Sequence, residues 1–220
     1  MLKSQLSHVQ DGFHVISPFS AYQLILVHQM AAPFETTQIF NKFLFAGKVV
    51  LCSGGGSGIC RGMTEALLRH GAKAAIISRS QDRLDKAAKE MQDQSGQEVL
   101  AVAADVRNPA DVEEAVKKTI ERFGRIDFLI CGAAGNFLSP VEKLSYNAFR
   151  TVIEIDLLGT YNLTKAALPH LKESKGSIVN VSATLSYTAT PLQVHSGSAK
   201  AAIDVSIGAA NDNNMRPVFL

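Results

Sequence analysis

A glycine-rich segment lies directly between a short valine-rich run and a helix-forming segment. The apolar run is KVVLC, residues 48–52, and the glycine-rich segment SGGGSGIC covers residues 53–60. A short run that is almost wholly apolar is typical of a strand buried on both faces of a parallel sheet. Glycines let the backbone turn sharply after such a strand, and the amides that open the next helix point towards an anion. This order predicts a phosphate-binding loop, with a plain tight turn as the alternative.

The rest of the chain alternates between apolar runs and helical patterns. Because helices that connect such strands form right-handed crossovers, the alternation indicates a parallel sheet covered on both faces. The sequence therefore predicts an α/β fold, a doubly wound parallel sheet of the Rossmann-like type. Beyond the first strand we expect strands at 73–78, 98–105, 126–135 and 176–183, and helices at 60–71, 80–94, 108–124, 145–174 and from about 195.

The composition fits a globular domain and excludes some classes of function. Apolar residues make up 46% of the 220 residues, charged residues make up 19%, and the formal net charge is +2. Without a run of Lys or Arg, nothing favours nucleic-acid binding. No window of about 18 apolar residues indicates a membrane span. Cys52, Cys60 and Cys131 lack metal-ligand spacing, so we expect no metal and small core thiols in a reducing compartment.

The end of the second expected strand bears on which dinucleotide would bind. Residues 78–80 read Ser-Arg-Ser, and Arg83 follows one helical turn later. A carboxylate at this position would bond the ribose hydroxyls of NAD, whereas an arginine fork matches a phosphate. Arg79, Ser80 and Arg83 therefore favour NADPH. A solvated arginine at a helix start is the alternative.

In combination these segments resemble the short-chain dehydrogenase/reductase family. Residues 53–60 are similar to its TGxxxGxG motif, with Ser53 in place of the threonine and Cys60 in place of the last glycine. Within the family, GAAGNF at 132–137, IDLLGTYN at 155–162 and LQVHSGSAKAAID at 192–204 resemble the peroxisomal 2,4-dienoyl-CoA reductases, including their fungal members.

The resemblance runs from about residue 47 to residue 204. It implies NADPH-dependent reduction of 2,4-dienoyl-CoA to 3-enoyl-CoA during oxidation of unsaturated fatty acids. It also implies an acyl-CoA substrate, a homo-oligomer and a peroxisomal location.

The resemblance also implies two sets of binding residues. In the substrate-binding set, the resemblance places Arg79 and Arg107 near CoA phosphates and the other members near the thioester end. For Phe137, ordinary core packing is the alternative. The cofactor-binding set is Gly54, Gly55, Gly56, Ser57, Gly58, Ile59, Arg79, Ser80, Arg83, Asp105, Val106 and Lys200. The substrate-binding set is Arg79, Arg107, Phe137, Ser145, Tyr146 and Asn147.

Three of the four catalytic positions of ordinary family members differ here. The tyrosine position is Ser196, the serine position is Ala183 and the asparagine position is Asp156, while Lys200 is retained. A ketone reductase must protonate an oxygen, but a dienoyl thioester takes hydride at the far end of its conjugated system, so oriented donors and a water can suffice. We expect Lys200 to bind the nicotinamide ribose and Asp156 to activate the water. The alternatives are a solvated lysine, a surface carboxylate and Tyr187 as a rival donor.

The two ends of the chain match the family least. We expect residues 1–46 to be an N-terminal extension, disordered or a gene-model artefact with Met30 as a plausible start, followed by an NADP-binding domain at 47–208 and a non-family tail at 209–220. The C-terminal strands of the sheet are expected to be missing, and the final residues form no peroxisomal tripeptide. The alternatives are a non-catalytic NADP-binding fragment or interaction module, or another acyl-CoA or ketoacyl reductase of the same family.

Overall fold

A computed structural model describes residues 36–209 and 216–219, and for 207–209 and 216–219 it describes the backbone alone. The chain divides into two compact units, Met1–Gln38 and Ile39–Leu220. Of the first unit, only the 3₁₀ turn η1 (Thr36–Gln38) is described. The expectations for residues 1–35, including the start at Met30, and for most of the tail at 209–220 lie outside the described residues.

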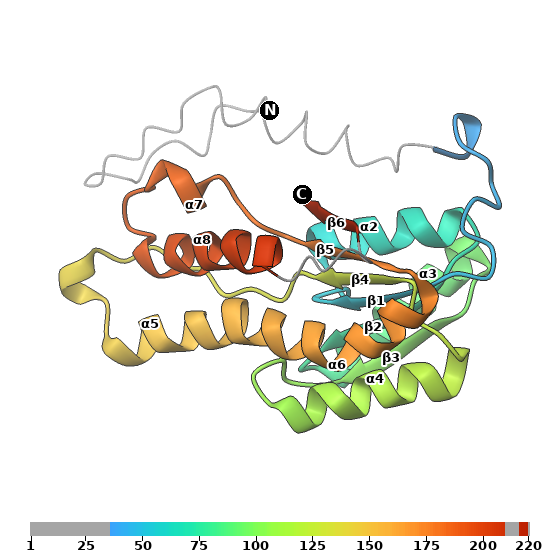
Figure 1. Ribbon diagram of the computed structural model, residues 1–220, viewed down its shortest axis with the longest axis horizontal. Coiled ribbons are helices and arrows are strands. Elements are labelled where there is room, and N and C mark those ends of the chain that lie inside the picture. The colour runs from blue at the N-terminus through green and yellow to red at the C-terminus, as the bar shows by residue number, and fades with distance from the viewer. Residues whose placement is uncertain (1–35, 210–215, 220) are drawn as a thin grey trace, which may run out of the picture. The chain divides into compact units, whose positions relative to one another are not determined.

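A parallel sheet forms the centre of the second unit (Figure 1). Its strand order is β3-β2-β1-β4-β5-β6, and every neighbouring pair is parallel. The chain runs from β1 outward to β3 on one side and then crosses to β4 on the other, which confirms the doubly wound, Rossmann-like prediction. The strands are β1 (Val49–Ser53), β2 (Lys73–Ser78), β3 (Val99–Ala103), β4 (Phe128–Cys131), β5 (Ser177–Asn180) and β6 (Arg216–Phe219).

Strand β6 corrects the expectation that the sheet has no strand after β5. Its four residues pair with β5 in a register that runs from Ser177↔Arg216 to Asn180↔Phe219. An edge strand pairs through backbone groups that any sequence carries, and a proline such as Pro217 is tolerated there. The sequence missed this strand because RPVF is too short to show a strand pattern of its own.

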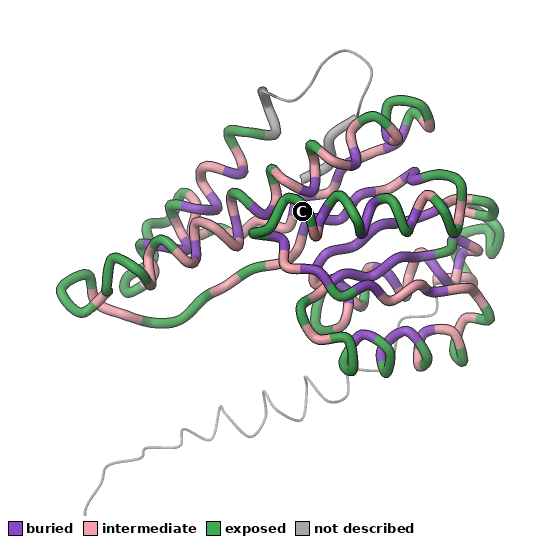
Figure 2. Tube along the Cα trace, turned by 90° about the horizontal axis from the view of Figure 1, so that it is seen from below, coloured by how far each residue is buried: buried purple, intermediate pink, exposed green. Residues whose placement is uncertain are grey.

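Helices cover both faces of the sheet, with their buried residues towards it and their exposed residues outward (Figure 2). On one face, Leu51 of β1 packs with buried residues of α4 and α6; on the other, Val50 and Cys52 pack with buried residues of α2 and α3. This alternation follows from the opposite directions of successive side chains along a strand. Of the remaining helices, α8 contacts both α5 and α7. The helices are α2 (Gly58–Arg69), α3 (Gln81–Ser95), α4 (Pro109–Phe123), α5 (Tyr146–Ile153), α6 (Gly159–Ser174), α7 (Leu185–Thr188) and α8 (Val194–Ala209).

The long helix expected at 145–174 contains a change of winding. The short 3₁₀ turn η2 (Val141–Lys143) precedes α5. Between α5 and α6 the chain forms one π-helical turn, η3 (Glu154–Leu158). Single π-turns inside α-helices frequently occur at functional sites. Asp156 lies in the middle of this turn and is its one buried residue.

Candidate functional site

The glycine-rich loop lies at the carboxyl ends of β1 and β4, where the strand order reverses. Gly54 has φ +72°, and a Cβ on it would lie 2.9 Å from the carbonyl oxygen of Gly132. A Cβ on Gly55 would lie 2.7 Å from Cγ2 of Ile76. Close packing therefore requires glycine at both positions, and the positive φ of Gly54 favours glycine there as well. Ligands of doubly wound sheets bind at this kind of reversal point.

Ser53 holds the loop against the connection that leaves β4. Its Oγ accepts hydrogen bonds from the backbone N–H groups of Gly132 (3.1 Å) and Ala133 (3.2 Å). In the described part of the chain the Ser57 side chain makes no capping hydrogen bond to α2, and Ile59 is 73% exposed. The Ser57 side chain thus leaves the first amides of α2 uncapped, which is the arrangement that an anion-binding helix start requires.

Cys60 takes the place of the motif's last glycine and packs against Gly132. A Cβ on Gly132 would lie only 1.9 Å from Cys60 Sγ, so the thiol fills the space in front of that glycine. A side-chain hydrogen bond with Cys52 lowers the pKa of Cys60, burial opposes this effect, and the charge of Lys200 lowers the pKa further. Burial raises the pKa of Cys131 to about 12. All three cysteines are buried and free, which confirms the interpretation of core thiols.

Arginines and a carboxylate meet at the ends of β2 and β3. Asp105 and Arg107 form a bidentate pair, with Arg107 Nε 3.0 Å from both carboxylate oxygens. Hydrogen bonds from Arg107 lower the pKa of Asp105 despite some burial, and the charge of Arg79 contributes to the lowering. Arg79 and Arg83 are exposed. The structure therefore brings Arg79, Asp105 and Arg107 together, with Arg107 bonded to Asp105.

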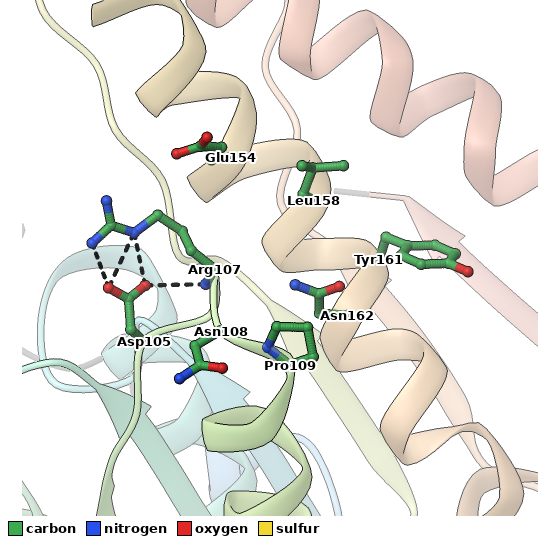
Figure 3. A pocket seen from close by; sticks show the side chains of 8 residues that line it. All are labelled: Asp105, Arg107, Asn108, Pro109, Glu154, Leu158, Tyr161 and Asn162. Carbon is green, nitrogen blue, oxygen red and sulfur yellow. Dashed lines mark hydrogen bonds and ion pairs between the residues drawn. The ribbon is translucent and has the colours of Figure 1, made fainter. Parts of the chain in front are cut away.

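A pocket of about 550 Å³ opens beside this pair (Figure 3). One wall comes from the connection between β3 and α4, and the other from η3 and α6. Asn162 Nδ2 donates a hydrogen bond to the carbonyl oxygen of Val106 (3.0 Å), and a Cβ on Gly159 would lie 2.6 Å from Val106 Cγ2. Sequence reasoning missed both contacts, although the two residues belong to the IDLLGTYN segment. The pocket is lined by Asp105, Arg107, Asn108, Pro109, Glu154, Leu158, Tyr161 and Asn162.

Asp156 and Lys200 form a buried pair between η3 and α8. Asp156 is fully buried, and its Oδ1 accepts a hydrogen bond from the N–H of Gly135 (2.7 Å). Its Oδ2 lies 3.4 Å from Lys200 Nζ, which itself donates to the carbonyl oxygen of Val181 (2.9 Å). The Lys200 side chain is 9% exposed. Neither residue is therefore a solvated surface charge.

The contact between Asp156 and Lys200 leaves hydrogen-bonding capacity on both groups. At 3.4 Å it is longer than a charge-assisted hydrogen bond, which is about 2.7–2.9 Å. Asp156 Oδ2 accepts no hydrogen bond from any described residue. Burial raises the pKa of Asp156, while the charge of Lys200, the N–H of Gly135 and the charge of His195 act in the opposite direction. A carboxyl group of raised pKa beside an ammonium group can hold and return a proton.

Several residues proposed for the substrate lie at the surface. Ser145 Oγ caps α5 by accepting from the N–H of Ala148 (3.1 Å), and Tyr146 is 94% exposed. Asn147 is also exposed. Tyr187, the rival donor, is 77% exposed on α7. By contrast, Ser196 at the tyrosine position is buried and lies four residues before Lys200 on α8.

Phe137 and His195 form a stacked pair that sequence reasoning did not identify. Their ring centroids are 4.3 Å apart with an interplanar angle of 21°. Phe137 is 41% exposed, whereas His195 is fully buried. His195 directly precedes Ser196, but a single histidine in an apolar segment carries no pattern that would mark it as a site residue. Only the packing of the connection after β4 against α8 brings these rings together.

Among the described residues, no group of acidic, histidine or cysteine side chains has the arrangement of a metal site. None of the described helices combines the length and apolar character that a membrane crossing requires.

Comparisons with known proteins identify relatives of the chain. A family model described as short chain dehydrogenase matches residues 48–212. A peroxisomal 2,4-dienoyl-CoA reductase of Saccharomyces cerevisiae is 52% identical over 174 residues, which cover 78% of this chain and 60% of that protein. One from Danio rerio is 45% identical over 187 residues, covering 81% and 62%. The chain thus spans about three fifths of the length of these curated relatives.

Solved structures show the same fold. An alcohol dehydrogenase from Thermococcus sibiricus, complexed with 5-hydroxy-NADP, matches with a TM-score of 0.75 at 32% identity, covering 78% of this chain and 74% of that chain. A short chain dehydrogenase from Bacillus anthracis matches with a TM-score of 0.70 at 39% identity, covering 74% and 68%.

Proposed function

The chain belongs to the short-chain dehydrogenase family, and from this premise we propose that it carries the cofactor site and the catalytic pair of an NADPH-dependent 2,4-dienoyl-CoA reductase. The product would be a 3-enoyl-CoA, as in the names of the curated relatives. The observation that carries the proposal is the buried pair of Asp156 and Lys200 in a site with Ser196 at the tyrosine position. A family member with this site has no phenol to protonate a ketone oxygen, so a conjugated thioester is the more suitable substrate.

The described residues fit a dinucleotide phosphate. The first amides of α2 are not capped by Ser57, and the close-packed Gly54 and Gly55 shape the loop in front of them. Arg79 is exposed at the end of β2, where a 2′-phosphate would need a cationic partner. These features and the NADP derivative in the Thermococcus relative support NADPH as the cofactor. When bound, NADPH supplies the hydride that adds to the far carbon of the conjugated diene.

Lys200 positions the reactants and contributes positive charge. It donates one hydrogen bond to Val181, which leaves two N–H bonds for other partners. We assign these N–H bonds to the ribose hydroxyls of the cofactor. The positive charge of the ammonium group also acts on Asp156. Because the site is buried, the ammonium group acts through a low dielectric, so its charge stabilises the negative charge that develops on the thioester oxygen.

Asp156 supplies the proton through a water molecule. Its Oδ1 is held by Gly135, and its Oδ2 is the oxygen that accepts no protein hydrogen bond. We assign Oδ2 to a water whose proton passes to the α-carbon of the dienolate. The protonated carboxyl group then returns a proton to that water, and its raised pKa makes the protonated form accessible.

Substrate selectivity tests this proposal. NADPH absorbance is followed with 2,4-hexadienoyl-CoA and with acetoacetyl-CoA, using this chain and the same chain continued by the C-terminal part of the yeast relative. We expect NADPH consumption with the dienoyl thioester and none with the ketoacyl thioester. Preference for acetoacetyl-CoA would contradict the proposal, and NADPH binding without turnover by either version would favour a non-catalytic NADP-binding module.

The location and assembly are also proposals. The curated relatives are named as peroxisomal, which supports a peroxisomal location for the protein. The family resemblance supports a homo-oligomer. Fluorescence microscopy of the tagged protein and sedimentation of the purified protein would measure these two properties directly.

A further inference from the structure

His195 is a buried imidazole that makes no hydrogen bond with the described part of the chain. It lies in the first turn of α8 and is fully buried. Neither Nδ1 nor Nε2 makes a hydrogen bond with any described residue. A neutral imidazole carries one N–H donor and one acceptor nitrogen, and leaving such buried groups unpaired costs free energy. Most buried polar side chains are therefore paired, so this exception requires an explanation.

The position of His195 relates it to the catalytic pair. Its ring stacks on Phe137, two residues beyond Gly135, whose N–H binds the carboxylate of Asp156. His195 also lies near enough to Asp156 to influence the pKa of that carboxyl group, against the larger effect of burial. His195 therefore lies near Asp156, with the ring of Phe137 stacked against its own.

The neighbouring backbone holds these two segments together. The N–H of Ser139 donates to the carbonyl oxygen of Leu192 (2.9 Å), which ties the connection after β4 to the segment that precedes α8. His195 is thus held between two anchored segments, and its orientation is set by the stacked ring of Phe137. Such an arrangement preorganises a donor before a ligand arrives.

We infer that His195 donates a ring N–H to the thioester oxygen of the acyl-CoA. This inference rests on the proposed function and assigns to His195 the hydrogen bond that the family's tyrosine would make from the position of Ser196. Hydride addition to the far carbon of the diene moves an electron pair onto the thioester oxygen. A donor at that oxygen stabilises the dienolate and releases no proton to it. Asp156 and its water remain the source of the proton for the α-carbon.

A purely structural histidine makes the opposite prediction. If the ring only fills space beneath Phe137, a phenylalanine should replace it with little effect, because it keeps a flat ring for stacking. If the ring donates to the thioester, His195→Phe should lose that hydrogen bond while His195→Gln should retain a donor. His170→Phe is the matched control, since His170 lies on α6 and lines a different surface pocket.

Ligand binding distinguishes a hydrogen-bonding role of His195 from a purely structural one without requiring turnover. The NADP⁺-saturated protein is titrated with 2,4-hexadienoyl-CoA and with free CoA, which has no thioester oxygen. We expect His195→Phe to weaken hexadienoyl-CoA binding by about tenfold or more, which is the cost of one lost hydrogen bond to a buried acceptor. Binding of free CoA should be unchanged. His195→Gln should lose less affinity, and His170→Phe should behave as the unaltered protein.

The imidazole itself provides a second measurement on the unaltered chain. With ¹⁵N-labelled histidine, the ring nitrogen resonances of His195 should shift on addition of hexadienoyl-CoA and not on addition of free CoA. The resonances are assigned by comparison with His195→Gln. This measurement decides the matter even if His195→Phe does not fold.

The outcomes distinguish the two proposals. Equal hexadienoyl-CoA affinity in the unaltered protein and His195→Phe, or unshifted His195 resonances in the complex, would overturn the role of His195 and leave the proposed function intact. An unaltered protein that binds free CoA but does not bind hexadienoyl-CoA more tightly, or that binds neither, would overturn both.

Discussion

Replacing Gly132 with alanine tests whether Cys60 occupies the space in front of the cofactor loop. A Cβ at this position would lie 1.9 Å from Cys60 Sγ, 3.3 Å from the carbonyl oxygen of Ser53 and 3.4 Å from Val181 Cγ2. Non-bonded heavy atoms usually stay about 3.5–4 Å apart. The overlap with the sulfur therefore requires Cys60 to move, whereas the other two contacts are only tight. Cys60 is 5% exposed and has little room to do so.

The magnitude follows from this overlap. Overpacking of a buried site usually costs about 1–3 kcal/mol, so Gly132→Ala should lower the free energy of unfolding by about 2 kcal/mol. Cys60→Ala removes one buried sulfur and should cost about 1 kcal/mol, as for similar small deletions. In the double variant the new methyl group takes the space of the lost sulfur. The double variant should therefore cost about 1 kcal/mol, which corresponds to a coupling of about 2 kcal/mol.

Urea unfolding of the four proteins measures this coupling. The free energies are compared at one temperature with a common slope against urea concentration. Costs that add to within about 0.5 kcal/mol would show that the two positions are independent. That result would refute the reasoning, because the loss in Gly132→Ala would then come from Ser53 or Val181 and not from the thiol.

Further predictions concern three acidic or basic side chains. Burial raises the pKa of Asp127, but hydrogen bonds from Arg125 and Lys48 lower this pKa below its ordinary value overall. The Asp127 carboxylate therefore stabilises the fold fully above about pH 4, and this stabilisation is lost as the pH falls through the lowered pKa. Asp127→Asn should therefore cost about 2 kcal/mol in urea unfolding at neutral pH and progressively less as the pH falls below about 4, and a cost that does not fall with pH would contradict this. Burial raises the pKa of Asp156, so the folded state is destabilised as the pH rises through and above the ordinary carboxyl range. Asp156→Asn should thus be more stable than the unaltered protein at neutral pH but not at acid pH. Its turnover should fall by about 10²- to 10⁴-fold, while NADPH binding is kept. Unchanged turnover would remove Asp156 from the mechanism. Arg79→Ala should weaken NADPH binding about tenfold, measured by fluorescence, with NADH binding unchanged; an equal loss for both cofactors would exclude recognition of the 2′-phosphate.

The order of elements could be predicted from the sequence because its signals are local. The apolar run at 48–52, the glycines after it and the repeated alternation with helical patterns specify a parallel sheet with crossovers on both faces. The sequence also predicted that the helix α4 ends at Gly124. This glycine has φ +78°, a conformation that glycine adopts without strain. The spacing of the glycines in residues 53–60 predicted the cofactor end of the site in the same way, through residues that are neighbours in the chain.

The proposed catalytic end of the site required the tertiary structure. Sequence reasoning named Asp156 and Lys200, but their burial and their 3.4 Å separation depend on the packing of η3 against α8. The π-helical turn, the stacking of Phe137 on His195 and the strand β6 had no local signature at all. The physical reason is that periodicity and turn chemistry act between residues close in the chain, whereas these features depend on which distant segments the crossovers bring into contact.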